Sequence, residues 1–178
     1  MIDLAGEEEV AKHLSQFKCS KNEDVERFLR NTAIPQERGS KSRTYLIVDE
    51  DSNQEGIPNI LAYFTLAIHI MVVSSKVSKS MAKRLAMFYD EDAEIQRTPC
   101  FLIGQIGKND LYGNNINGDE IIRYAIDAIY IAHVQIGGKF IKIDCEPVTK
   151  LMEYYTRNGF HLVQYDEKDN LNELVMFF

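Results

Sequence analysis

The 178-residue sequence has few cysteines and no long uninterrupted apolar segment. Its three cysteines, Cys19, Cys100 and Cys145, are odd in number and far apart, which excludes a disulfide framework and a CxxC metal or redox pair. We therefore predict reduced thiols that are mostly buried. The longest apolar run, residues 60–73, contains threonine and histidine and is shorter than the about 20 residues that a bilayer-spanning helix needs.

The sequence also lacks an excess of basic residues. It has 20 Lys and Arg against 27 Asp and Glu, a net charge of −7 and a pI near 5.1, whereas nucleic-acid-binding proteins usually carry a basic surface. Extensive contact with nucleic acid is therefore not expected, and the cation-rich segments 18–30 and 76–84 are interpreted as solvated helix faces, with local basic patches as the alternative. The acidic N-terminal residues MIDLAGEEEV contain no apolar signal core, so we expect a cytoplasmic protein.

What is present is typical of one folded domain. Hydrophobic residues make up 45% and charged residues 26%, as in average globular proteins. The length suits one well-buried domain, so residues 1–178 are predicted to form a single domain. Hydrophobic periodicity predicts helices over residues 22–35, 77–89, 118–136 and 147–158. It predicts strands over residues 13–19, 43–48, 60–69, 101–108, 139–145, 161–165 and 171–178.

The most informative stretch is residues 103–122, where an apolar strand passes through a loop rich in Gly and Asn into a helix. Gly and Asn tolerate positive φ, and a helix N-terminus presents unpaired N–H groups with partial positive charge, so this order is typical of a phosphate cradle. An ordinary strand-to-helix loop is the alternative. Asn117 and Glu120 have the spacing of a capping box, and Gly137-Gly138 ends the helix. The strand that follows completes a right-handed parallel crossover.

Three stretches resemble the GNAT superfamily of acetyl-CoA-dependent N-acetyltransferases. Residues 17–45 are similar to the N-terminal half of a GNAT branch that includes acetyltransferase toxins. Residues 103–108, IGQIGK, are similar to the family strand LGRLAV, and residues 153–160, EYYTRNGF, to the family ending F-Y-x-x-x-G-F. The resemblance implies an α/β (α+β) fold with a mixed, mostly antiparallel sheet, a central parallel strand pair and about four flanking helices.

The resemblance further implies acetyl-CoA as cosubstrate, with no metal. The residues that it assigns to cofactor binding are Ile106, Gly107, Lys108, Gly113, Asn114, Asn115, Asn117 and Gly118. The family pattern Q/R-x-x-G-x-G/A matches this loop only at Gly118, but backbone amides hold a pyrophosphate and Asn can replace Gly in left-handed conformations. Asp119 and Glu120 bring negative charge close to the expected phosphates.

The implied chemistry is direct attack of an amine on the thioester. Tyr155 matches the family's proton donor to the departing thiolate, the alternative being a tyrosine packed on the sheet. For the general base the candidates are His69, or Glu37 or Glu146 acting through water. Cys145 is interpreted as a buried strand cysteine, because no Cys-His pairing is recognisable. No H-x-x-x-H, GxSxG or Walker pattern supports another chemistry.

The leading hypothesis is therefore an N-acetyltransferase that modifies a primary amine of a small molecule or protein. The alternatives are toxin-like acetylation of aminoacyl-tRNA, suggested by the N-terminal resemblance, and a non-catalytic CoA-binding or interaction protein, suggested by the altered loop. The expected partner is an amine acceptor whose identity the sequence does not give, with tRNA the one nucleic acid under consideration and no membrane. A homodimer is left open.

Overall fold

The computed structural model of the protein describes residues 6–52, 58–90, 92–93 and 95–178. The chain forms two compact units, one from residues 1–66 and 105–125 and the other from residues 67–104 and 126–178. The segment between the predicted strands 43–48 and 60–69 lies partly outside the described residues. The prediction of a single domain stays a prediction.

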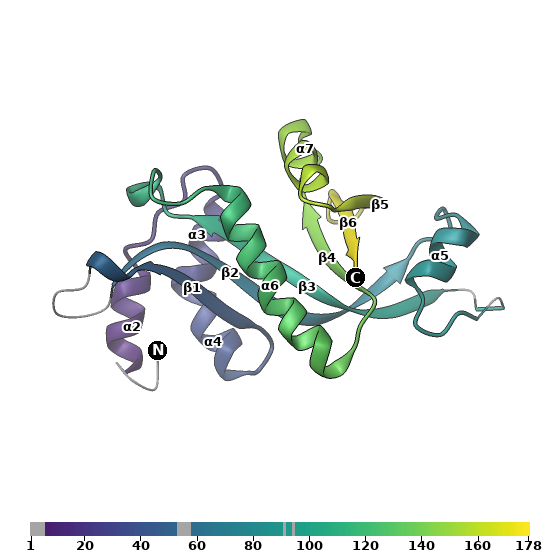
Figure 1. The fold of residues 1–178 in the computed structure, drawn as a ribbon, viewed down its shortest axis with the longest axis horizontal. Coiled ribbons are helices and arrows are strands. Elements are labelled where there is room, and N and C mark those ends of the chain that lie inside the picture. Colours follow the sequence, from purple (N-terminus) through teal and green to yellow (C-terminus); the bar gives the residue numbers. More distant parts are fainter. Residues whose placement is uncertain (1–5, 53–57, 91, 94) are drawn as a thin grey trace. The chain divides into compact units, whose positions relative to one another are not determined.

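Six strands form a mixed sheet in the order β1-β2-β3-β4-β6-β5 (Figure 1). The strands are β1 Arg43–Asp49, β2 Asn59–Val73, β3 Gln96–Lys108, β4 Phe140–Cys145, β5 His161–Asp166 and β6 Leu171–Phe177. The helices are α2 Glu7–Leu14, α3 Glu23–Arg27, α4 Ala33–Arg38, α5 Lys79–Leu85, α6 Gly118–Ile136 and α7 Thr149–Arg157. Single turns are the π-helical η1 Phe28–Thr32 and the 3-10 turns η2 Glu50–Ser52 and η3 Asp110–Tyr112. The predicted fold class is confirmed, because β3 and β4 pair in parallel and the other described strand pairs are antiparallel.

In the first unit, α2, α3 and α4 cover one face of the β1–β2 hairpin (Figure 1). The hairpin is antiparallel, with Arg43 opposite Leu66 and Asp49 opposite Asn59. Its buried core joins the helices to β2, and the Phe17 ring packs edge-on against the ring of Tyr63 at 5.2 Å. This core supports the part of the first unit in which β3 ends and α6 begins.

Two sequence predictions in this unit are wrong. The predicted strand 13–19 is instead the end of α2 and the turn after it, because Val10 and Leu14 lie four residues apart on one buried helix face and three glutamates stabilise the first turn. Pro35 does not stop the second helix, which continues to Arg38. Pro35 occupies the first turn of α4, where a missing N–H costs no helical hydrogen bond.

The second unit contains the parallel pair and the C-terminal strands. β3 and β4 pair over only three positions, Phe101–Ile103 with Ile141–Ile143, so the strand pairing ends before Gly104 and Asp144. β4 then pairs along its whole length with β6, which also pairs with β5. A second core joins β2, α5, β3, β4 and β6, and its most buried members are Met71, Leu85, Phe140 and Val175.

The predicted thiols are confirmed, since Cys19, Cys100 and Cys145 are all free and buried. Burial raises the pKa of the Cys100 thiol to about 12 and that of Cys145 to about 11. Neither thiol is therefore an ionised nucleophile near neutral pH. Among the described helices, none has the length and apolar character needed to cross a bilayer.

Candidate functional site

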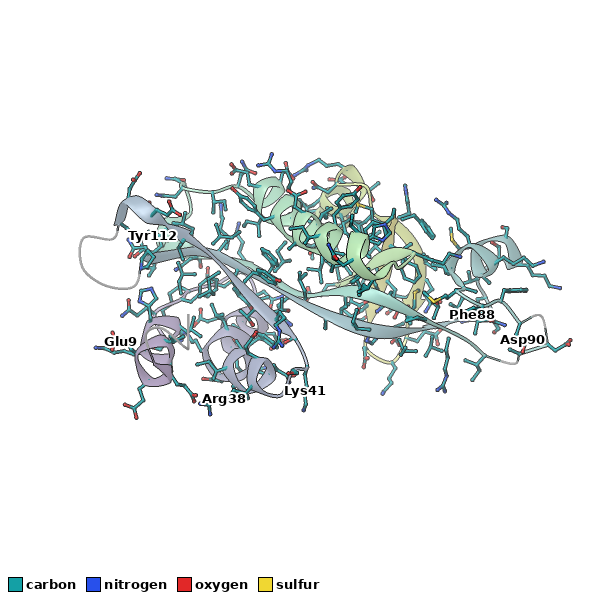
Figure 2. The ribbon with its side chains drawn as sticks, turned by 60° about the horizontal axis from the view of Figure 1, so that its bottom comes forward. Glu9, Arg38, Lys41, Phe88, Asp90 and Tyr112 are labelled. Atoms are coloured by element: carbon teal, nitrogen blue, oxygen red, sulfur yellow. The ribbon has the colours of Figure 1, made fainter. Side chains whose placement is uncertain are left out.

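The loop between β3 and α6 contains the predicted cofactor-binding residues. β3 ends at Lys108, the 3-10 turn η3 follows, and α6 begins at Gly118; Tyr112 marks the end of η3 in Figure 2. The predicted capping box is confirmed. The Asn117 N–H donates to Glu120 Oε2 at 2.9 Å, and the Glu120 N–H donates to Asn117 Oδ1 at 3.0 Å. These two bonds fix the N-terminus of α6 and direct it toward the loop.

Asn109 anchors this loop to the first unit. Its side chain is only 3% exposed, and its Nδ2 donates to the Ile60 carbonyl oxygen at 2.8 Å. Its Oδ1 accepts from the N–H groups of Lys18 and Leu111, each at 3.2 Å. Sequence reasoning missed this residue, because Asn109 resembles any loop asparagine until its distant partners are known.

Lys108 supports the loop by hydrogen bonds to its backbone. Its Nζ donates to the Gly113 carbonyl oxygen at 2.7 Å and to the Ile116 carbonyl oxygen at 3.3 Å. The ammonium group therefore lies against two backbone carbonyls of the loop. Lys108 was predicted as a cofactor-binding residue, and its position beneath the loop makes it a support for the backbone.

The Gly and Asn residues of the loop do not use the positive φ that they tolerate. Gly113 has φ −59°, and the non-glycine residues with positive φ in the described chain are Ser40 and Asn170. The Asn109 side chain caps η3 and starts a right-handed turn, which the loop continues. Even so, no described residue accepts a hydrogen bond from the N–H groups of Asn114 or Ile116.

Gly107 has a structural reason to be glycine. A Cβ at this position would overlap Val25 Cγ1 and lie 3.0 Å from Tyr63 Cε1. Gly107 therefore lets β3 approach the core of the first unit closely. The sequence assigned Gly107 to the cofactor site, and the structure gives the absence of its side chain a packing role.

Tyr155, the predicted proton donor, lies on α7 in the second unit. Its side chain is 5% exposed and packs edge-on against the rings of Tyr154 and Phe160. Burial raises the pKa of the Tyr155 hydroxyl, so this group stays protonated at neutral pH. The hydroxyl makes no hydrogen bond with any residue that the structure describes, although a buried tyrosine hydroxyl usually has a partner.

His69, the predicted base, lies near the end of β2. Its side chain lines a cavity of about 680 Å³ in the second unit. Partial burial, reinforced by the charge of Lys142, lowers the pKa of His69, so the imidazole is neutral at pH 7. Tyr155 is not among the residues that line this cavity, so the structure does not place the two predicted catalytic residues in one pocket.

The other candidate bases have different surroundings. The Glu37 carboxylate accepts from the Thr44 N–H at 2.8 Å and from the Arg43 guanidinium at 3.0 Å, so it joins α4 to β1. Glu146 is exposed just after β4. Cys145 Sγ lies 3.8 Å from Met152 Sδ in the core, as expected for a buried strand cysteine. The described residues contain no group of three or more potential ligands that could hold a metal ion.

Comparison with known proteins gives structural similarity without close sequence similarity. No family model matches the sequence, and no curated protein matches it. The structure of AtaT complexed with acetyl-methionyl-tRNAfMet has a TM-score of 0.68 and 20% identity, covering 93% of this chain and 86% of that chain. AtaTR bound with AcCoA has a TM-score of 0.68 and 21% identity, covering 92% of this chain and 86% of that chain.

The KacTA–DNA complex has a TM-score of 0.60 and 19% identity, covering 88% of this chain and 81% of that chain. At these identities the similarity establishes a common fold. The chain therefore has the GNAT-like fold that its sequence predicts, and shares it with the AtaT toxin and with KacT.

Proposed function

We propose that the protein is an acetyl-CoA-dependent N-acetyltransferase. The observation that carries the proposal is the GNAT fold, shared with the solved structure of AtaTR bound with AcCoA. In this chain the β3–α6 loop fits an anionic cosubstrate. It combines the capped N-terminus of α6, the N–H groups of Asn114 and Ile116, from which no described residue accepts a hydrogen bond, and the ammonium of Lys108 beside the loop carbonyls.

In the proposed reaction the acceptor nitrogen bonds to the thioester carbonyl carbon while the carbon–sulfur bond breaks. Tyr155 donates its hydroxyl proton to the departing sulfur and regains one from the acceptor nitrogen, which loses a proton as the amide forms. The hydroxyl is protonated at neutral pH and accepts or donates no hydrogen bond with a described residue, so it is available to the sulfur. His69 serves as the base, because its neutral imidazole can accept the proton that the acceptor ammonium must lose.

Isothermal titration calorimetry with acetyl-CoA tests the cosubstrate, and release of free CoA in the presence of an amine tests the reaction. We expect saturable binding in the micromolar range, roughly as for other enzyme substrates. Absence of heat at millimolar acetyl-CoA would instead favour the non-catalytic alternative. Binding of acetyl-CoA with no release of free CoA, whichever amine of a broad set is added, would also favour that alternative.

Aminoacyl-tRNA is a second candidate acceptor, because AtaT, which shares this fold, has been solved with acetyl-methionyl-tRNAfMet. The charge distribution does not favour it. In the cation-rich segment 18–30, Arg30 pairs with Glu26 at 2.7 Å and Arg27 pairs with Asp24. In segment 76–84, Lys76 pairs with Glu167 at 2.7 Å.

Acetyl transfer to methionyl-tRNA, compared with transfer to a small amine, separates these acceptors. A tRNA substrate predicts activity that falls steeply as salt rises from 50 to 200 mM, by about a thousandfold if many phosphates are contacted. A small amine predicts a weak salt dependence.

A further inference from the structure

The cavity beside His69 contains a charged cluster that the proposed reaction does not use. Its walls come from the C-terminal part of β2, from β4, β5 and β6, and from the β5–β6 turn. The β5 residue Gln164 ties two of these walls together. Its Nε2 donates to the Val72 carbonyl oxygen at 2.8 Å, and its Oε1 accepts from the Ser74 N–H at 2.8 Å.

Lys142 forms the floor of this cavity. Its side chain is 2% exposed, and its Nζ lies 2.5 and 2.6 Å from the two carboxylate oxygens of Asp144 and 2.9 Å from Glu173 Oε1. Desolvation opposes ionisation, yet the hydrogen bonds and charges of the two carboxylates together raise the pKa of Lys142, so it stays charged. Two carboxylates therefore surround one ammonium and leave a net negative charge.

Asp144 has capacity for a further donor. Its side chain is 29% exposed, and no described residue other than Lys142 donates a side-chain hydrogen bond to it. A carboxylate offers about four lone-pair positions, of which Lys142 occupies two. By contrast, Glu173 is 12% exposed, and its second oxygen accepts from Gln164. Asp144 is thus the partly buried carboxylate of this cavity that can accept a further hydrogen bond.

The rest of the lining defines the charge and shape of that ligand. Five carboxylates and three lysines line the cavity, so its formal charge is −2 with His69 neutral. Aliphatic side chains of Ile70, Val72 and Leu171 line it as well. A negative cavity with apolar walls suits an alkyl chain that ends in a cation, and it repels phosphates.

We propose that this cavity binds a primary alkylammonium group, with the Asp144 carboxylate as its direct partner and Lys142 as the residue that positions that carboxylate. Identifying this ammonium as the acceptor of acetyl transfer rests on the proposed function, whereas the binding itself does not. The inference favours a small amine over tRNA, because a polynucleotide would bring phosphates close to the acidic cavity.

Calorimetric titration of the full chain with n-butylammonium chloride, without acetyl-CoA, tests this inference. We expect saturable binding with a Kd of about 1–10 mM, weakened about tenfold or more in Asp144→Asn through loss of a charge-assisted hydrogen bond. Asp127→Asn is the matched control, because Asp127 is exposed on α6 and does not line the cavity. The same titration with 1-butanol should show no saturation.

A second readout covers the case in which Asp144→Asn fails to fold. The imidazole NMR signals of His69 in the wild-type chain should shift with n-butylammonium concentration and stay unchanged with 1-butanol. Absence of saturable binding at about 50 mM, equal binding of 1-butanol, unchanged affinity in a folded Asp144→Asn, or unshifted His69 signals would overturn the inference. Binding without acetyl transfer to any amine would instead overturn the proposed function and leave the cation site in place.

Discussion

Replacing Asn109 with alanine should lower the free energy of unfolding by about 2–3 kcal/mol, because the buried amide makes three hydrogen bonds. The bond to the Ile60 carbonyl oxygen is 2.8 Å long, and the bonds from the Lys18 and Leu111 N–H groups are each 3.2 Å long. A net hydrogen bond contributes about 0.5–1.5 kcal/mol, and the two longer bonds count at the lower end of that range. The substitution also leaves the Ile60 carbonyl without a described side-chain donor.

Urea denaturation followed by circular dichroism measures this change. With an m-value of about 2–3 kcal/mol/M, the midpoint should fall by about 1 M at constant m. Asn114→Ala is the control in the same loop, because the Asn114 side chain is exposed and makes no described hydrogen bond; its free energy of unfolding should stay within about 0.5 kcal/mol of wild type. An Asn109→Ala midpoint equal to that of Asn114→Ala would refute the idea that Asn109 anchors the loop.

Three further predictions concern the core, the proposed proton donor and the buried thiols. Gly107→Ala should destabilise the protein by about 1–3 kcal/mol through overpacking against Val25, measured by urea denaturation. Gly113→Ala, whose new Cβ would lie 3.7 Å from the nearest described atom at φ −59°, should be neutral or slightly stabilising; equal losses in both variants would contradict the packing role of Gly107. Tyr155→Phe should lower turnover by about one to three orders of magnitude without changing the calorimetric Kd for acetyl-CoA, and unchanged turnover would remove Tyr155 from the mechanism. Because burial raises the pKa of Cys100 to about 12 while an unfolded thiol ionises near 9.0, the unfolded state binds fewer protons above pH 9. The free energy of unfolding should therefore fall as pH rises from 9 toward 12, by at most about 1.4 kcal/mol per pH unit for this thiol. Cys100→Ala should reduce that slope in denaturation series at several pH values, and an identical slope would count against a buried neutral thiol.

Local sequence signals account for most of the secondary structure. Apolar residues at helical spacing and the capping box of Asn117 and Glu120 predicted α6, whose N-terminus the structure places where expected. Strand, helix and strand in succession predicted the parallel pairing of β3 and β4. These signals succeed because they depend on neighbours within a few residues along the chain.

Signals that depend on distant partners were misread. The Gly and Asn residues of the loop tolerate positive φ, but Asn109 bonds to partners 49 and 91 residues away and starts a right-handed turn. Pro35 was expected to end a helix. It instead lies in the first turn of α4, directly after the π-helical η1, where its missing N–H breaks no helical hydrogen bond. In both cases a hydrogen-bonding arrangement outside the local pattern decided the backbone conformation.

By itself, the sequence determined most of the elements after residue 42 and their order, because periodicity and capping are encoded locally, and it carried the resemblance to GNAT enzymes. Only the tertiary structure decided that Lys142 is buried. In an alternating strand such as β4, a lysine is expected on the solvent-facing side. Lys142 and Asp144 are two residues apart and therefore lie on the same face of the strand, but this spacing does not indicate that the face is buried. Burial of that ammonium requires Glu173, which the pairing of β4 with β6 brings to it from 31 positions along the chain. Charge compensation across paired strands has no local sequence signature, and for this reason the cavity beside His69 could be found only in the folded chain.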